Sequence, residues 1–382
     1  MTLHKSHIIY FLLSLWGILF QTPFGLISIT DIVVIIIAII QILRAKLFHF
    51  DKSRLFFLIL IIYLFFLGIF FSFNSEFYII NHYKNLLRVL FSFIFICSLE
   101  FDKILRDKDS LKKIIIFTLN FHSILLILDY FFQLPISWNG YTYFGISDFQ
   151  RPRGLYPEPS FAAITIILNL FLLLTLNEFK LKKTILGFAA LVISTSLIGI
   201  LGAALLFLVS LIKSPKENIF QLRTIFLIIL IVITFTLISE YVLSRITLYD
   251  GSFLKRFYGS YLTLNYILAN YPWFGLGLGS DNYDLIPTLS TLEFSSQNDL
   301  ECHAMKKCDA EVNRSNTNSI ISLITGGGIT LLFLYFKMIY HAIGIRNLNF
   351  LICFYVLISF GSPFIPTIIM TIWILSYLNF KN

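Results

Sequence analysis

The sequence contains few charged residues for its length, and this shortage excludes a soluble globular domain. Asp, Glu, Lys and Arg make up 13% of its 382 residues, against about 25% in an ordinary soluble domain. Apolar residues make up 57%, including 42 Phe, and the mean hydropathy is +0.83. Such a chain is expected to be a polytopic membrane protein. Its net charge of +8 is then expected to orient the chain in the bilayer and not to bind nucleic acid.

Three further absences narrow the class. No small-residue cleavage site follows the first apolar run, Ile8–Phe20, so this run is predicted to be a membrane helix and not a removed signal peptide. No internal repeat is visible, which counts against a transporter built from repeats. Cysteines are also sparse. Cys97 and Cys353 fall in apolar runs and are expected to be small core residues.

Alternating apolar runs and polar turns predict an all-α polytopic protein with about twelve transmembrane helices. Helices 1–9 are expected in residues 1–242 (with a short periplasmic loop at 135–157), a large periplasmic loop between helices 9 and 10 in 243–317, and helices 10–12 in 318–382. The run Thr184–Ile212 is long for one pass, and Ser194-Thr195-Ser196 permits a break into two short helices. Of the 29 Lys and Arg residues, 19 fall in the predicted inner loops, so both termini are expected in the cytoplasm.

A stiff, charged stretch lies in the shorter outer loop, from Gln150 to Phe161. It holds Arg151, Arg153 and three prolines, which fix φ near −65° and disfavour helix in the residue before them. Guanidinium suits phosphate because its planar fork of donors matches two phosphate oxygens. This stretch therefore predicts a site for an anionic group. An ordinary polar loop near lipid headgroups is the alternative.

The large outer loop has two informative parts before its cysteines. The first contains Arg245 and Arg256, and apolar residues follow at helical spacing, which predicts an amphipathic segment along the membrane surface. The second is Asn270–Gly279. Its proline is expected to stop the helix, and its alternate glycines let main chain approach a ligand or another chain closely.

Cys302 and Cys308 lie further along the same loop, with His303 beside the first. In an oxidising compartment a short-loop disulfide is the leading expectation for two such cysteines. A metal site that uses His303 is the alternative, although four ligands are not evident.

Three segments of this chain together carry a resemblance to a known family. They are Arg151–Ser160, Arg256 with Asn270–Gly277, and Asn318–Ile321 with Gly328-Ile329. In this order they resemble the Arg-x-Gly…Glu-Pro segment, the Arg…Pro-Leu-x-Gly-x-Gly segment and the Asn-x-x-Leu…Gly-Ile helix start of the bacterial O-antigen polymerase and ligase superfamily (Wzy-type polysaccharide polymerases). Their order and spacing and the twelve-helix layout agree over most of the chain, so the combination carries the resemblance.

The resemblance implies a glycosyltransferase-type enzyme of the bacterial inner membrane. It would join undecaprenyl-diphosphate-linked oligosaccharide repeat units of O-antigen, capsule or exopolysaccharide at the periplasmic face. Charge grows on the leaving lipid diphosphate in the transition state, so prepositioned guanidinium groups would stabilise it there. Arg153 and Arg256 are the expected clamp, with Arg151 and Arg245 in reserve. No Asp-x-Asp motif stands in the outer loops, so glycosyl transfer without a metal or other cofactor is expected.

Glu158, His303 and Asp281 are the candidates to orient or deprotonate the acceptor hydroxyl. The alternatives are a structural pairing of Glu158 with an arginine and a solvated loop position for His303. Lys84 and Arg88 are expected to pair with lipid phosphate, or else to snorkel towards the membrane surface. The remaining residues expected to bind substrate are Tyr156, Gly275, Gly277 and Asn318.

One departure from the family pattern favours a polymerase over a ligase. Ligase members place a histidine immediately before the motif asparagine, and here that position is Thr317, before Asn318. The general base therefore stays unassigned. An O-antigen ligase or other lipid-linked oligosaccharide transferase, or a polysaccharide flippase, is the alternative. The expected partners are the lipid-linked substrates, the bilayer and a chain-length regulator, with no nucleic acid.

Overall fold

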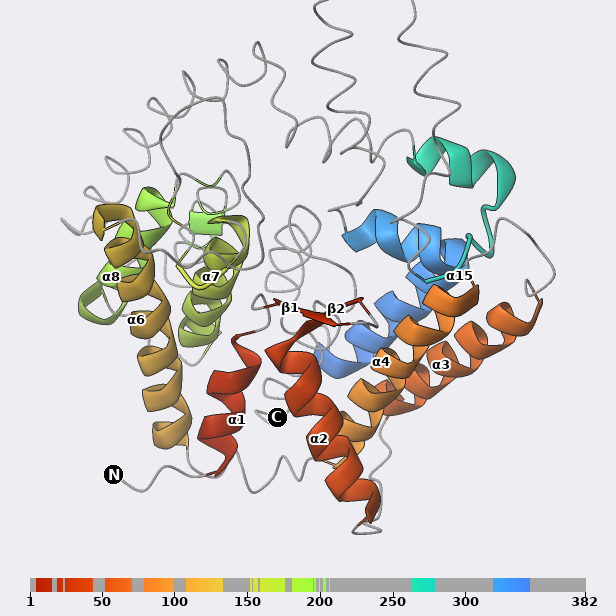
Figure 1. Ribbon diagram of the computed structural model, residues 1–382, viewed down its shortest axis with the longest axis horizontal. Helices are drawn as coiled ribbons and strands as arrows, with labels where there is room; N and C mark the ends of the chain where they lie inside the picture. Colours follow the sequence, from red (N-terminus) through yellow and green to blue (C-terminus); the bar gives the residue numbers. More distant parts are fainter. Residues whose placement is uncertain are drawn as a thin grey trace, which may run out of the picture.

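The computed structural model describes residues 5–15, 19–22, 25–43, 52–70, 79–98, 108–132, 154–156, 159–175, 181–194, 263–278 and 319–343, with single positions at 152, 196, 199, 202, 203 and 206. These residues are mostly helical (Figure 1), which confirms the predicted helical class. The labelled elements are α1 (Lys5–Leu13), β1 (Leu19–Thr22), β2 (Gly25–Ser28), α2 (Ile29–Leu43), α3 (Lys52–Phe70), α4 (Ile79–Ser98), α6 (Lys108–Phe132), α7 (Pro159–Thr175), α8 (Leu181–Ile193) and α15 (Ser319–Ile343).

Two of the described helices are long and apolar enough to cross a membrane. They are Lys112–Phe132 in α6 and Ile320–Met338 in α15. The 21 residues in α6 span about 30 Å, which is the thickness of the hydrocarbon core of a bilayer, and the α15 segment has 19 residues. The predicted count of about twelve helices and the 243–317 loop extend over residues outside the described part.

The first apolar run differs from its prediction. The sequence predicts a helix over Ile8–Phe20 and a turn over Gln21–Thr30, but α1 ends at Leu13 and β1 begins at Leu19. β1 pairs antiparallel with β2. The apolar residues at the end of this run fit a strand as well as a helix, and hydrophobicity alone does not decide between the two. The all-α expectation is therefore wrong at this hairpin.

Ser28 and Asp31 explain why α2 starts directly after β2. The Asp31 N–H donates to Ser28 Oγ at 3.0 Å, and Asp31 Oδ2 accepts from the N–H and the Oγ–H of Ser28 at 3.0 and 2.9 Å. This reciprocal arrangement is a capping box, and it puts a carboxylate at the positive end of the helix dipole. The buried charge of Asp31 is therefore part of the helix cap.

The second half of the chain shows one predicted helix break. α8 ends at Ile193, directly before the polar Ser194-Thr195-Ser196 stretch. The Ser194 N–H still bonds to the Ala190 oxygen at 2.9 Å, and Ser194 Oγ donates to the Leu191 oxygen at 2.7 Å, so the serine closes the last turn. The predicted break after the first half of Thr184–Ile212 is confirmed at this position.

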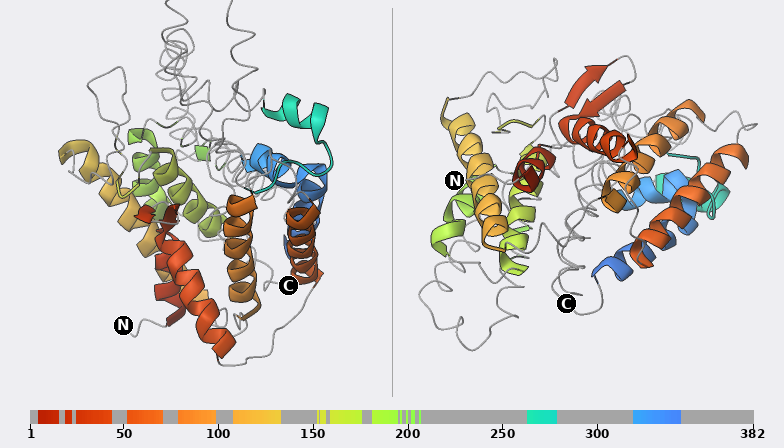
Figure 2. Two further views of the ribbon diagram at one scale, coloured as in Figure 1. Left: turned by 45° about the vertical axis from the view of Figure 1, so that its right-hand side comes forward. Right: turned by 90° about the horizontal axis from the view of Figure 1, so that it is seen from below.

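The described helices pack in two groups (Figures 1 and 2). In the α3 group, α3 packs against α15 and α4, and α4 packs against α2. In the α6 group, α6 packs against α7 and α8, and α7 packs against α8. α1 contacts both α2 and α6, so the N-terminal helix joins the two groups.

α3 and α15 run antiparallel. Phe56, near the start of α3, stacks on His341, near the end of α15, with ring centroids 4.8 Å apart. Tyr63 lies further along α3, and its hydroxyl donates to the main-chain oxygen of Gly327, which lies earlier in α15, at 2.7 Å. The first residues of α3 therefore lie beside the last residues of α15.

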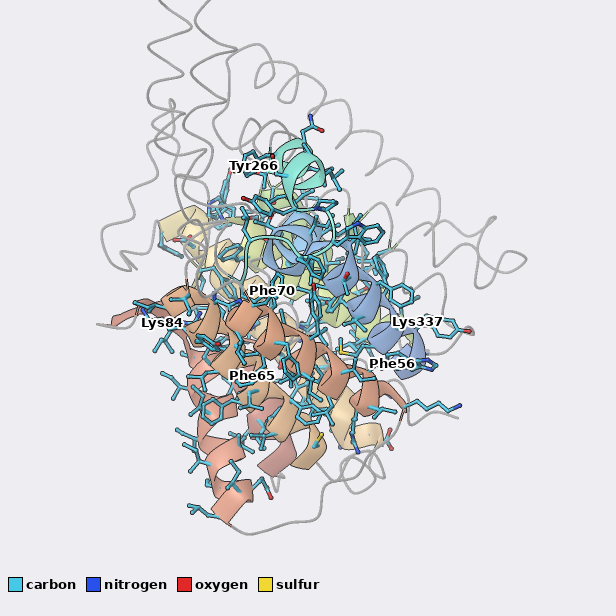
Figure 3. The ribbon with its side chains drawn as sticks, turned by 90° about the vertical axis from the view of Figure 1, so that its right-hand side faces the viewer. Phe56, Phe65, Phe70, Lys84, Tyr266 and Lys337 are labelled. Atoms are coloured by element: carbon cyan, nitrogen blue, oxygen red, sulfur yellow. The ribbon has the colours of Figure 1, made fainter. Side chains whose placement is uncertain are left out.

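α7 and α3 differ in how much apolar side chain they leave exposed. In α7 every residue from 160 to 174 is buried. α3 instead leaves an apolar face exposed, made of Leu55, Ile59, Ile62, Phe65, Phe66, Ile69 and Phe70. Figure 3 looks onto this part of the molecule, with Phe65 and Phe70 labelled. A contiguous apolar face of this kind is rare on soluble monomers and fits the lipid of a membrane.

Candidate functional site

The segment around Gly154 crosses the end of α6 as a turn. Gly154 has a φ of 57°, and its N–H donates to Asp129 Oδ2 at 2.9 Å. A Cβ added to Gly154 would lie 3.6 Å from the main-chain nitrogen of Leu126, so the turn rests against α6. α7 begins only after this segment, at Pro159. The prediction that its prolines keep the stretch out of a helix is confirmed at positions 154–156.

Tyr156 anchors this segment to the end of α1. Its side chain is 2% exposed, and its hydroxyl donates to the main-chain oxygen of Ser14 at 2.7 Å. Burial raises the pKa of the Tyr156 hydroxyl, so the group keeps the proton it donates. A substrate contact by Tyr156 stays a prediction, and this burial does not favour it.

His122 of α6 completes the buried contact. Its Nε2 lies 2.9 Å from Ser14 Oγ, and its Nδ1 lies 3.4 Å from the Tyr156 hydroxyl. Ser14 Oγ also lies 2.6 Å from the main-chain oxygen of Phe11, which can only accept, so the serine proton points there. We therefore assign the Nε2–H of His122 as the donor to Ser14. The imidazole cross-links α6 to the end of α1.

This network was not predicted from the sequence, although α6 carries its signal. Thr118, His122 and Asp129 recur on one face of α6 at helical spacing, inside a largely apolar run. Polar residues within a membrane helix usually face the interior of the bundle, so the spacing could have singled them out. A further bond ties α1 to α7, because the Tyr10 hydroxyl donates to Asn169 Oδ1 at 2.6 Å.

The second resembling segment is described over residues 263–278. Residues 263–270 are helical, which confirms the predicted helix before Pro272. Ile267 is buried and Leu268 is exposed, so one face of this short helix packs on the protein. In Figure 1 this segment lies above α15, at the upper end of the helices.

Gly275 and Gly328 bring this segment into main-chain contact with α15. α15 loses helical geometry at Gly327 and Gly328, and Gly328 has a φ of 68°. A Cβ on Gly275 would lie 2.7 Å from the Gly328 nitrogen, and a Cβ on Gly328 would overlap the main chain of Trp273. Gly275 (φ 63°) brings main chain close to a neighbour, but this neighbour is α15 of the same chain and not the ligand or second chain that the sequence suggested. Contact of Gly275 and Gly277 with substrate stays a prediction.

The break in α15 leaves main-chain groups that the neighbouring segments satisfy. The Leu276 N–H donates to the Thr325 oxygen at 2.6 Å, and the Ile329 N–H donates to the Pro272 oxygen at 2.9 Å. Tyr63 supplies the bond to Gly327 described above. α15 starts at Ser319, as the third resembling segment predicts, whereas Gly328-Ile329 marks its break and not its start. The second and third segments thus form one joint, called here the glycine joint.

His82 fastens the same segment to α4. It is fully buried, its Nδ1 lies 3.0 Å from the Leu278 N–H, and its Nε2 lies 2.8 Å from the Leu64 oxygen. An amide N–H can only donate and a carbonyl can only accept, so Nδ1 is the acceptor and Nε2 carries the proton. One imidazole therefore bridges α3 and residue 278. The sequence shows this histidine beside Lys84 but gives no partner for it.

Lys84 and Arg88 lie one helical turn apart on α4. Lys84 is exposed and Arg88 is half-buried. Phe57 packs on Phe93 with ring centroids 5.2 Å apart, while His82 meets Leu64, so α4 runs antiparallel to α3. The two cations therefore lie in the half of α4 that packs along the second half of α3 (Lys84 is labelled in Figure 3). Their pairing with lipid phosphate stays a prediction.

The other predicted site residues lie outside the described part of the chain. They are Arg151, Arg153, Glu158, Arg245, Arg256, Asp281, Cys302, His303, Cys308 and Asn318. Among the residues that the structure does describe, no three His, Cys, Asp or Glu side chains gather to hold a metal ion. The arginine clamp, the acceptor base, the disulfide and the absence of a metal all stay predictions.

Comparison with protein-family models and with curated proteins finds no match for this chain. The resemblance to O-antigen polymerases therefore rests on the three segments quoted from the sequence.

Proposed function

We propose that this protein is a membrane-embedded polymerase that joins undecaprenyl-diphosphate-linked oligosaccharide repeat units at the periplasmic face of a bacterial inner membrane. A hydroxyl of the incoming unit attacks the anomeric carbon of the growing glycan and gives its proton to a base. The new glycosidic bond forms as the bond from that carbon to the diphosphate breaks. The lipid diphosphate leaves with the electron pair.

The observation that carries the proposal is that the resembling segments contact α6, α15 and α3 away from the lysine-bearing ends of these helices. α6 has Lys112 in its first turns and meets Gly154 near its other end. α15 has Lys337 in its last turns and meets Gly275 at its break. α3 begins at Lys52. In each case the basic end and the resembling segment are separated along the helix.

The positive-inside rule turns this separation into an orientation. Lys and Arg near helix ends collect on the cytoplasmic side. The end of α6 that meets Gly154 and the part of α15 that precedes its break would then face the periplasm. That is the side on which polymerases of this kind meet lipid-linked oligosaccharides, and it supports the twelve-helix layout with inner termini.

The arginines supply the chemistry of the proposal. Negative charge grows on the leaving diphosphate, and guanidinium groups fixed beforehand stabilise it more in the transition state than in the ground state. Arg153 and Arg256 form this clamp, and Arg151 and Arg245 are in reserve. Lys84 and Arg88 contact a second lipid phosphate. Transfer proceeds without a metal, because the cationic side chains take the role of a Lewis acid.

Reconstitution tests the function directly. The purified protein is placed in lipid vesicles with a short lipid-linked repeat unit, and the glycan products are separated on a gel. We expect a ladder of products spaced by one repeat unit, and release of undecaprenyl diphosphate in step with each addition. Vesicles that contain the Arg153→Ala variant serve as the control.

Two other outcomes would replace the proposal. Transfer of a single preformed chain to a lipid acceptor, with no ladder, would make the protein a ligase. Movement of the lipid-linked unit across the vesicle membrane, with no new glycosidic bond, would make it a flippase.

The flippase is the second candidate because α15 is broken. Discontinuous helices line the substrate sites of many transporters, and the half-buried Arg88 within α4 also fits such a pathway. However, the groups freed at the break already bond to Pro272, Leu276 and Tyr63. The break is thus occupied by the protein itself, and the polymerase is favoured.

A further inference from the structure

A buried carboxylate lies near the end of α6, three residues before its last residue. Asp129 is 8% exposed, while the three residues that follow it, Tyr130, Phe131 and Phe132, are exposed apolar side chains. Burying a carboxylate costs free energy unless hydrogen bonds compensate it. A negative charge is also unfavourable beside a site that must attract diphosphate. Asp129 therefore needs a reason to be there.

The Gly154 N–H gives that reason. It donates to Asp129 Oδ2 at 2.9 Å, a usual distance for an N–H···O hydrogen bond. Gly154 has a φ of 57°, which L side chains rarely adopt, and the space around its Cβ position shows only ordinary contacts with Leu126. Glycine is therefore needed for its conformation. The carboxylate and the left-handed turn together fix where the chain crosses α6.

Arg153 is joined directly to this fixed point. The N–H that Asp129 holds belongs to the peptide group that links Arg153 to Gly154, and the Cα atoms of these two residues are about 3.8 Å apart. Arg151 lies only two residues further back. A main chain held at one amide restricts the positions that a guanidinium group on the neighbouring residue can reach, which is how a site becomes preorganised.

We propose that Asp129 is a positioning residue, which fixes Arg153 for the diphosphate by holding the Gly154 amide. The inference rests on the proposed function, in which Arg153 contacts the leaving group. Asp129 itself acts through the main chain and does not touch substrate. A role as the acceptor base is disfavoured, because the carboxylate is buried and one of its oxygens is bonded to the Gly154 amide.

Two substitutions separate the hydrogen bond from the charge. Asp129→Ala removes the acceptor, whereas Asp129→Asn keeps an acceptor oxygen of nearly the same shape and removes the charge. Ser123→Ala is the matched control, because Ser123 is also buried in α6 and its hydroxyl donates only within the helix, to the Leu119 oxygen. Protein amounts in the membrane are compared by immunoblot, so that a variant that fails to insert is recognised.

Hydrogen–deuterium exchange gives a readout that does not depend on activity. The peptide from 152 to 159 contains three prolines, so few amides contribute to its signal besides that of Gly154. We expect exchange in this peptide to become about tenfold faster or more in Asp129→Ala, since a bond to a charged group is lost. Asp129→Asn should stay within about threefold of the wild type, and Ser123→Ala should be unchanged.

Polymer length in the reconstituted assay gives the second readout. We expect Asp129→Ala to slow repeat addition about tenfold or more, and Asp129→Asn to retain most of the activity. Unchanged exchange in Asp129→Ala would overturn the inference whatever the enzyme does. Faster exchange with normal polymer would also overturn it, because the held amide would not matter for the reaction. An Asp129→Asn variant whose exchange is as slow as that of the wild type, but which makes no polymer, would overturn the inference as well.

Failure of the proposed function would look different. In that case the wild-type protein would make no ladder, while the exchange data would still show whether Asp129 holds the Gly154 amide.

Discussion

The first two of the three resembling segments are held to the helices in different ways. The segment at 154–156 is held by side chains, because Asp129 takes the Gly154 amide and Ser14 takes the Tyr156 hydroxyl. The segment at 271–278 is held mainly by main chain, in the glycine joint with α15. The bonds of the 154–156 segment connect it to α6 and to the end of α1. The bonds of the 271–278 segment connect it to α15, which belongs to the α3 group.

This difference determines how each region should respond to mutation. A side-chain bond contributes about 1 kcal/mol net, or about 1.5–3 kcal/mol when one partner is charged, and neighbouring bonds can partly replace it. A main-chain joint has no spare room, because a new Cβ meets atoms that cannot rotate away. The glycine joint should therefore fail abruptly, whereas the side-chain-held segment should weaken in steps.

Gly328→Ala is expected to have the largest effect. The added methyl group would overlap the main chain of Trp273, and its φ of 68° adds a cost of about 1–2 kcal/mol for an L residue. We expect little folded protein in membranes and a strongly lowered Tm in detergent. Gly326→Ala is the control, since its nearest neighbour is the flexible end of Leu278, at 3.0 Å. A stable Gly328→Ala protein would show that the joint is loose.

Substitution of the arginines tests whether the two regions serve one site. Arg153 adjoins the side-chain-held segment, and Arg256 precedes the main-chain-held one. Lysine keeps the charge but loses the planar fork. A lost contact of about 1.5–3 kcal/mol slows turnover about ten- to a hundredfold, so Arg153→Lys and Arg256→Lys should both accumulate single repeat units at normal protein levels.

The arginine experiment reads polymer length on gels from cells, and Lys306→Ala serves as the control with normal polymer expected. If both arginine variants make full-length polymer, no diphosphate clamp of these residues exists. If only one is impaired, the two regions do not share a ligand.

Part of this comparison could be predicted from the sequence. Pro152, Pro157 and Pro159 predict a non-helical segment before α7, and Pro272 with Gly275 predicts a helix end followed by a close main-chain approach. These residues act through their own backbone preferences, which do not depend on neighbours far along the chain. Local chemistry is enough for such predictions.

The partners of these segments could not be predicted in the same way. The glycines reveal that main chain comes close, but not that the neighbour is the break in α15. His122 and His82 each bond to residues more than a hundred positions away, Ser14 and Leu278, and one sequence contains no record of such pairs. The β1–β2 hairpin was missed for another reason, because an apolar run can form a strand or a helix.

His82→Ala is expected to have an intermediate effect. It leaves the Leu64 oxygen and the Leu278 N–H without this partner, at a cost of about 1–3 kcal/mol. We expect a lowered Tm and faster hydrogen exchange at 276–278, with exchange at 154–156 unchanged because the two fastenings are independent. Ser92→Ala is the control, since its buried hydroxyl bonds within α4 to the Arg88 oxygen. Faster exchange in both segments would contradict the separation.

Tyr156→Phe is expected to have the smallest effect of the four. It removes the hydroxyl that donates to the Ser14 oxygen at 2.7 Å but leaves the ring beside His122, with centroids 5.5 Å apart. The net loss should be about 1 kcal/mol, seen as a Tm a few degrees lower than that of the exposed control Tyr130→Phe. Combined with Asp129→Ala, which removes the bond to the Gly154 amide, the loss should exceed the sum of the single losses if the two bonds substitute for each other in holding the segment. A strictly additive double variant would mean that each bond holds its own part of the turn, and the stepwise weakening expected of this region would then lack its cause.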